Sequence, residues 1–165
     1  MPESTKLSPE LVRLLGEDGF RARRKLAIPL LTCDPEGTPR AALLAFSEIR
    51  ALSPRRMAAA VASGSRTEAN LIRRPGATIL VLDAGLSVSI RCEAGKAHVS
   101  IAQPDRKIFP LRVVGVKEDE PLPGEQNVAI AAGPRFAGPR ANEVFLPALF
   151  EELAGPSGRG AGRGK

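Results

Sequence analysis

The chain has 165 residues, of which 43% are hydrophobic and 25% charged, and this predicts one globular domain over residues 1–154, followed by a disordered, basic Gly/Arg tail at 155–165. The net charge is +6, but three of the positive charges (Arg159, Arg163 and Lys165) lie in the tail, so the charge of the domain does not favour nucleic acid as a partner. Two cysteines are too few for a disulfide framework or a zinc site. The polar N-terminus argues against a signal peptide, and the lack of any apolar run near 20 residues argues against a membrane partner. We therefore expect a cytoplasmic protein without a metal.

The first predicted element is a short helix over residues 8–16. Ser8 is a good N-cap, Pro9 suits the first helical position, and Gly16 can end the helix.

A β-hairpin follows, because two apolar runs flank the turn-forming stretch DPEGTP. We expect its strands at Leu26–Cys33 and Arg40–Glu48. Pro29 lacks a backbone N–H, which predicts an edge position or a bulge in the first strand.

The alanine-rich stretch SPRRMAAAVASG (residues 53–64) is compatible with a helix or a strand. Its shortness and its neighbours favour a strand. The next stretch, SRTEANLIRRPG, predicts a short helix with Ser65 as N-cap and Glu68 completing a capping box. Pro75 and Gly76 end it. The hydroxyls at the start of this helix would suit either a structural cap or an anion site.

The second half is rich in Val and Ile and predicts strands within 77–83, 86–103 and 108–119, with Gly85, Gly95 and Gly115 at turns, bulges or bends. Residues 140–155 predict a C-terminal helix in which Pro147 starts or kinks the last turns. Because no regular β-α-β units occur, the element order favours a mainly β fold, a small antiparallel barrel with peripheral helices.

Reactive side chains are few. His98, the only histidine, has no metal-ligand or triad pattern around it, and we interpret Cys33 and Cys92 as packed thiols. A function that needs a metal cluster or a nucleophile is therefore not indicated.

In their order and spacing, the hairpin and the short helix resemble the pyridoxamine 5′-phosphate oxidase-like FMN-binding split barrels. The hairpin fits the family pattern D-x-x-G-x-P at Asp34, Gly37 and Pro39. The helix fits S-x-[KRT]-x-x-N-[LI], followed closely by a proline; the matching residues are Ser65, Thr67, Asn70, Leu71 and Pro75. The resemblance covers about residues 26–99, and it does not extend to the C-terminal arginine-rich signature of the oxidases themselves.

This resemblance implies a six-stranded antiparallel split barrel that forms a homodimer, with FMN, or alternatively the deazaflavin F420, bound in a groove at the dimer interface. It implies that the phosphate is held near the start of the short helix and that the second hairpin strand, at Ala42–Phe46, runs along the isoalloxazine ring. The residues so implied are Ala42, Leu43, Leu44, Ala45, Phe46, Ser63, Ser65, Arg66, Thr67 and Asn70. Phe46 and Phe109 are the aromatic side chains expected near the ring.

Three functions follow as hypotheses. The first is an FMN-dependent oxidoreductase acting on a small-molecule substrate, with the flavin carrying the chemistry. The second is a cofactor-binding or structural dimer of the same fold without catalysis. The third is an unrelated barrel that binds nucleic acid, which the scarcity of stacking aromatics disfavours.

Overall fold

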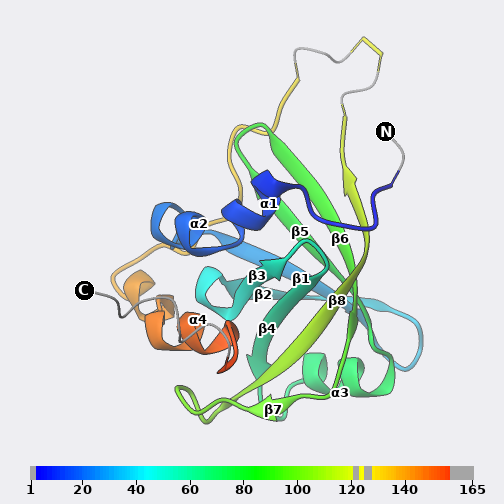
Figure 1. Ribbon diagram of the computed structural model, residues 1–165. Coiled ribbons are helices and arrows are strands. Elements are labelled where there is room, and N and C mark those ends of the chain that lie inside the picture. Colours follow the sequence, from blue (N-terminus) through cyan, green and yellow to red (C-terminus); the bar gives the residue numbers. More distant parts are fainter. Residues whose placement is uncertain (1–2, 121–122, 125–127, 157–165) are drawn as a thin grey trace.

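Eight β-strands form one antiparallel sheet in the computed structural model, which describes residues 3–120, 123–124 and 128–156 (Figure 1). The strand order is β2-β1-β5-β6-β8-β4-β3, and the two-residue β7 pairs with β8. Their bounds are Ala27–Cys33 (β1), Pro39–Ala45 (β2), Ile49–Ser53 (β3), Arg56–Ala62 (β4), Gly76–Asp83 (β5), Leu86–Ala94 (β6), His98–Val99 (β7) and Arg106–Glu118 (β8). The mainly β, antiparallel split-barrel prediction is confirmed, with more strands than the predicted six. Most of the predicted tail, from residue 157 on, lies outside the described residues.

Strand β1 lies between β2 and β5, so Pro29 does not sit on an edge strand as one alternative predicted. The pairing of β1 with β5 covers only Leu30 and Leu31, whereas β1 pairs with β2 along its whole length. Pro29 thus lies just before the two residues of β1 that pair with β5. Its missing N–H therefore removes no hydrogen bond between these strands. The hairpin prediction is otherwise confirmed.

The second hairpin strand ends earlier than predicted. Residues Phe46–Glu48 form a 3₁₀ turn, and the chain then enters β3. The turn is stabilised by Glu48, whose carboxylate Oε2 accepts a hydrogen bond from the Ala45 N–H at 2.8 Å. A side chain that bonds the backbone three residues earlier favours a tight turn over a continued strand.

The alanine-rich stretch is strand β4, and residues 57–61 within it are all buried. The following helix α3 (Arg66–Arg73) begins after Ser65, whose Oγ accepts from the Glu68 N–H at 3.2 Å, so the predicted N-cap is confirmed. The Glu68 carboxylate accepts from the N–H of Gly64 rather than from that of Ser65, and it also pairs with Lys107. Two side chains, Ser65 and Glu68, therefore fix the start of α3.

Four further helical segments cover the sheet: α1 (Pro9–Leu14), α2 (Glu17–Ala22), the 3₁₀ turn η2 (Ala141–Val144) and α4 (Pro147–Leu153). Figure 1 shows α1, α2 and α4 gathered on one side of the sheet and α3 at the end near β7. Pro147 occupies the first turn of α4, and Phe145 before it is extended, so the predicted helix over 140–155 is divided in two.

Most of the aromatic side chains join these helices to the barrel. The Phe20 ring stacks on Phe150 with centroids 4.0 Å apart and on Phe145 at 4.7 Å. Phe46 packs tilted against both Phe20 and Phe150. Phe46 is completely buried and Phe109 almost so, which removes both from the surface where a flavin ring could stack.

A buried polar network fixes α3 against the first hairpin. Asn70 is 2% exposed, and its Nδ2 donates to Thr32 Oγ1 and to Asp34 Oδ1, each at 3.0 Å. The Asp34 carboxylate also accepts from Arg40 Nε at 2.9 Å. The hydrogen bonds from Arg40 and then from Asn70 lower the pKa of Asp34 to about 2.

This network predicts acid sensitivity that Asp34→Asn removes. Because the folded-state pKa lies below the ordinary aspartate value of about 3.9, the Asp34 carboxylate stabilises the fold above that pH, and its contribution is lost as the pH falls towards 2. Urea titrations across this pH range should show a shallower decline in the free energy of unfolding for Asp34→Asn than for wild type. Glu36→Gln, at an exposed acid of the same turn, is the control and should keep the wild-type slope. Equal slopes for wild type and Asp34→Asn would contradict the assignment.

Candidate functional site

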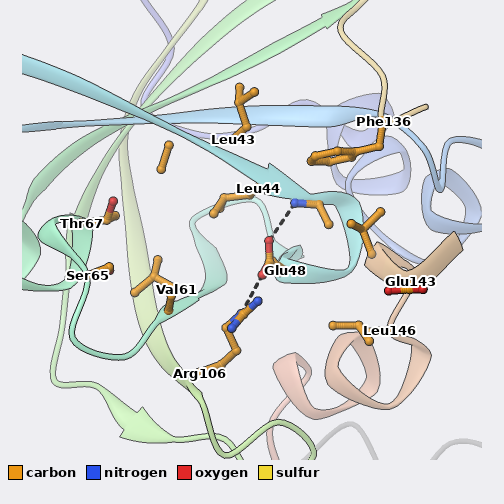
Figure 2. Close-up of a pocket in the computed structure, with 14 residues that line it drawn as sticks. Leu43, Leu44, Glu48, Val61, Ser65, Thr67, Arg106, Phe136, Glu143 and Leu146 are labelled. Carbon is orange, nitrogen blue, oxygen red and sulfur yellow. Dashed lines mark hydrogen bonds and ion pairs between the residues drawn. The ribbon is translucent and has the colours of Figure 1, made fainter. Parts of the chain in front are cut away.

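A groove of about 340 Å³ opens between strand β2, the start of α3 and the C-terminal segment, near the lower limit for small-molecule sites (Figure 2). Strands β2, β4 and β8 and helix α3 contribute residues to its walls. The remaining wall is formed by residues after 135. The lining residues are Ala42, Leu43, Leu44, Ala45, Glu48, Val61, Ala62, Ser65, Thr67, Arg106, Phe136, Glu143, Val144 and Leu146.

The first wall is an unpaired strand edge. Strand β2 lies at one end of the sheet order and pairs only with β1. The Ala45 N–H points to Glu48 rather than to β1, so alternation along an antiparallel strand turns the backbone groups of Leu43 the same way, off the edge. This alternation leaves the Leu43 N–H without a partner on β1, and Leu43 is 58% exposed. This edge can hydrogen-bond a planar polar ligand.

The end of the groove at α3 carries hydroxyls and backbone donors. Ser65 and Thr67 lie there together (Figure 2). The Ser65 oxygen accepts the Glu68 N–H, which leaves its own hydrogen free to donate. Among the described residues, no group accepts from the backbone N–H of Arg66 or Thr67. Unpaired N–H groups at a helix start, with hydroxyls beside them, suit an anion such as a phosphate.

An ion pair lies in the middle of the groove. Arg106, at the start of β8, donates from Nε to Glu48 Oε1 at 2.9 Å, while the other Glu48 oxygen holds the Ala45 N–H. Arg106 also pairs with the exposed Asp105. Burial lowers the pKa of Arg106, but the bonds to Glu48 and Asp105 outweigh burial and raise this pKa above its ordinary value. The guanidinium therefore stays charged.

The remaining wall is built by the segment that leads into α4. Figure 2 shows Phe136, Glu143 and Leu146 on this side of the groove. The segment is held by backbone bonds from Phe136 N–H to Lys25 and from Ala27 N–H to Pro134. Ser47 also holds it, donating to the Val144 carbonyl at 2.8 Å. The wall is thus a fixed part of the structure and supplies an aromatic ring.

Six of the ten sequence-predicted site residues line this groove: Ala42, Leu43, Leu44, Ala45, Ser65 and Thr67. Phe46 is buried with the other rings and Asn70 in the network around Asp34. Ser63 is exposed outside the groove. The side chain of Arg66 is 69% exposed and lies 3.8 Å from Asp34, on the hairpin side of α3.

Glu48, Arg106 and Phe136 line the groove but are not among the residues that the sequence predicts for the site. Glu48 falls within a predicted strand, and nothing local distinguishes Arg106 from the other arginines of this chain. Phe136 lies outside the span of the family resemblance. The only local signal is the proline pair that brackets it in GPRFAGP, which is typical of an extended, fixed segment.

Other reactive side chains lie elsewhere. His98 is exposed on β7, and burial raises the pKa of the Cys92 thiol to about 12, which confirms the packed-thiol interpretation for Cys92; Cys33 is partly buried. Within residues 3–120, 123–124 and 128–156, no three His, Cys, Asp or Glu side chains are grouped to hold a metal ion. None of the helices in these ranges has the length and apolar character to cross a membrane.

Comparison with known proteins begins with sequence. No family model matches the chain. It is 30% identical over 114 residues to the uncharacterized protein YclD of Bacillus subtilis (strain 168), which covers 68% of this chain and 74% of YclD. The chain therefore belongs to the same family as YclD.

Solved structures show the same fold. A candidate pyridoxamine 5′-phosphate oxidase from Lactobacillus delbrueckii matches with a TM-score of 0.57 at 18% identity, over 71% of this chain and 99% of that one. An FMN-binding protein from Syntrophomonas wolfei matches with a TM-score of 0.56 at 15% identity, over 69% and 87%. An F420 reductase matches with a TM-score of 0.51 at 16% identity, over 67% and 98%. The chain thus has the split-barrel fold of the pyridoxamine 5′-phosphate oxidase-like proteins.

Proposed function

We propose that this member of the YclD family binds FMN in the groove beside β2 and acts as a flavin-dependent oxidoreductase on a small-molecule substrate. The observation that carries the proposal is the union, in one groove, of an unpaired strand edge and a hydroxyl-lined helix start. FMN has a planar ring with a polar edge and a phosphate at the end of a flexible chain, and each wall matches one of these parts. Two proteins with a similar structure, an FMN-binding protein and an F420 reductase, support the proposal.

The residues divide the task. Ser65 and Thr67, with the backbone N–H groups of α3, would hold the phosphate. The free backbone groups of Leu43 would bond the polar edge of the ring, and Leu44 and Val61 provide apolar contact below it. Bound FMN would supply the transfer of reducing equivalents, while these side chains bind it and exclude water.

A cofactor-binding dimer without catalysis is the alternative. The ionisable side chains lining the groove are Glu48, Arg106 and Glu143 within the described residues, and each of them is ion-paired. No free acid or base therefore points into the groove from this part of the chain. A flavin that passes electrons needs none, so the two functions are separated by turnover and not by the geometry of the site.

The cofactor that co-purifies with the protein tests the proposal directly. Protein purified from an expression host with ordinary flavin supply should be yellow, and mass spectrometry of the released compound should identify FMN. The deazaflavin F420 is the expected compound only if the chain takes up F420 and not FMN when both are offered. A colourless protein that binds neither on titration would overturn the proposal.

Thr67→Val tests the phosphate end. The substitution removes the hydroxyl at nearly constant volume, and a charge-assisted hydrogen bond contributes about 1.5–3 kcal/mol, so affinity for FMN should fall about tenfold or more. Affinity for riboflavin, which has no phosphate, should stay unchanged in the same fluorescence titration.

Arg66→Gln is the matched comparison for Thr67→Val, because it alters the neighbouring side chain but keeps the backbone N–H. The exposed Arg66 should contribute less than Thr67. A larger loss for Arg66→Gln than for Thr67→Val would place the phosphate on the hairpin side of α3.

We further propose a homodimer in which the second copy covers the open side of the groove. The support is the unpaired β2 edge with the exposed Leu43 beside it, since an uncovered strand edge invites pairing. Light scattering should give twice the mass of the chain, and Leu43→Asp should shift the protein towards monomer. The same change at Ile101, exposed outside the groove, should not. A monomeric wild type would contradict the dimer.

A further inference from the structure

We infer that Arg106, aligned by Glu48, stabilises negative charge on the ring system of the bound flavin and is not a phosphate ligand. The inference rests on the proposed function, because it assigns a role to a side chain of the same groove. It concerns the electrostatics of the ring end, which the sequence motifs leave unaddressed.

Its charge singles out Arg106. Among the described residues that line the groove, it carries the single positive charge. Arg66, the cation that the helix motif suggests, lies outside the groove near Asp34. Glu143 on the facing wall is paired with Arg140 at 2.7 Å. Any negative charge that develops on a ligand in the middle of the groove therefore has Arg106 as its cation.

The position of Arg106 is fixed relative to the edge of β2. Glu48 accepts hydrogen bonds from both the Ala45 N–H and Arg106, so the guanidinium is held next to the strand edge that would bond the ring. Figure 2 shows Arg106 beside Glu48, apart from Ser65 and Thr67 at the α3 end of the groove. Both oxygens of Glu48 are engaged, which limits the guanidinium to one orientation.

Arg106 also has a donor to spare. Its Nε donates to Glu48 and its Nη1 donates to Asp105, while Nη2 has no acceptor among the described residues. Its hydrogens can donate to a ligand oxygen. Reduction of bound FMN by two electrons and one proton, supplied by a hydride donor or by dithionite and water, would leave one more negative charge on the ring system. A fixed cation nearby then binds the reduced form more tightly than the neutral oxidised form.

Arg106→Gln tests the inference through the midpoint potential of bound FMN. Loss of the cation should weaken binding of reduced FMN about tenfold more than binding of oxidised FMN, which for a two-electron couple lowers the potential by about 30 mV. Arg106→Lys, which keeps the charge, should recover part of this shift. Arg112→Gln, an ion-paired arginine on the same strand outside the groove, is the control and should leave the potential unchanged. Circular dichroism verifies that each variant is folded.

Titrations with FMN and riboflavin separate the two ends of the groove. Arg106→Gln should change the affinity for both oxidised compounds by the same factor, because the phosphate is not its partner. A loss confined to FMN would make Arg106 a phosphate ligand and overturn the inference, as would an unchanged potential. A wild-type chain that binds no flavin would overturn the proposed function first, and this inference with it.

Discussion

The buried carboxylate of Glu48 is the contact on which the groove depends. It turns the backbone out of β2 by accepting the Ala45 N–H, and it holds Arg106 from a strand on the other side of the groove. Burying a carboxylate is costly unless each oxygen is paired, and both oxygens are paired here. One side chain therefore fixes the end of β2, the start of β3 and the direction of the guanidinium together.

The turn that Glu48 makes explains why the edge of β2 stays free. A strand that continued to residue 48 would run on past the groove, whereas the 3₁₀ turn sends the chain into β3, at the opposite end of the sheet order. The edge that remains is short, and its outward backbone groups alternate with those bonded to β1. Natural sheets cover or block such edges. Along this edge the fold leaves an open groove, which is the space that a covering group could fill.

Local chemistry made much of this architecture predictable. The hairpin at DPEGTP, the Ser65 cap and the presence of the strands depend on neighbours within a few residues, and the structure agrees with these, although β2 ends at Ala45 and not at Glu48. The 3₁₀ turn, the division of the last helix and the role of Arg106 depend on contacts that no local pattern reveals. Glu48 and Arg106 are 58 residues apart in sequence. Phe46 shows the same limit, because its pattern fits a strand while its ring packs with Phe20 and Phe150.

The unequal ends of the groove give an occupant one orientation. Hydroxyls and helix N–H groups at α3 favour a fully charged oxyanion, whose charge is met by several weak donors. The guanidinium of Arg106, held by Glu48 and Asp105, is the cation nearer to β2. A flavin bound as proposed would therefore place its ring system towards β2 and Glu48 and its phosphate towards Thr67, and the wall at Phe136 would then be the side from which a substrate reaches the ring.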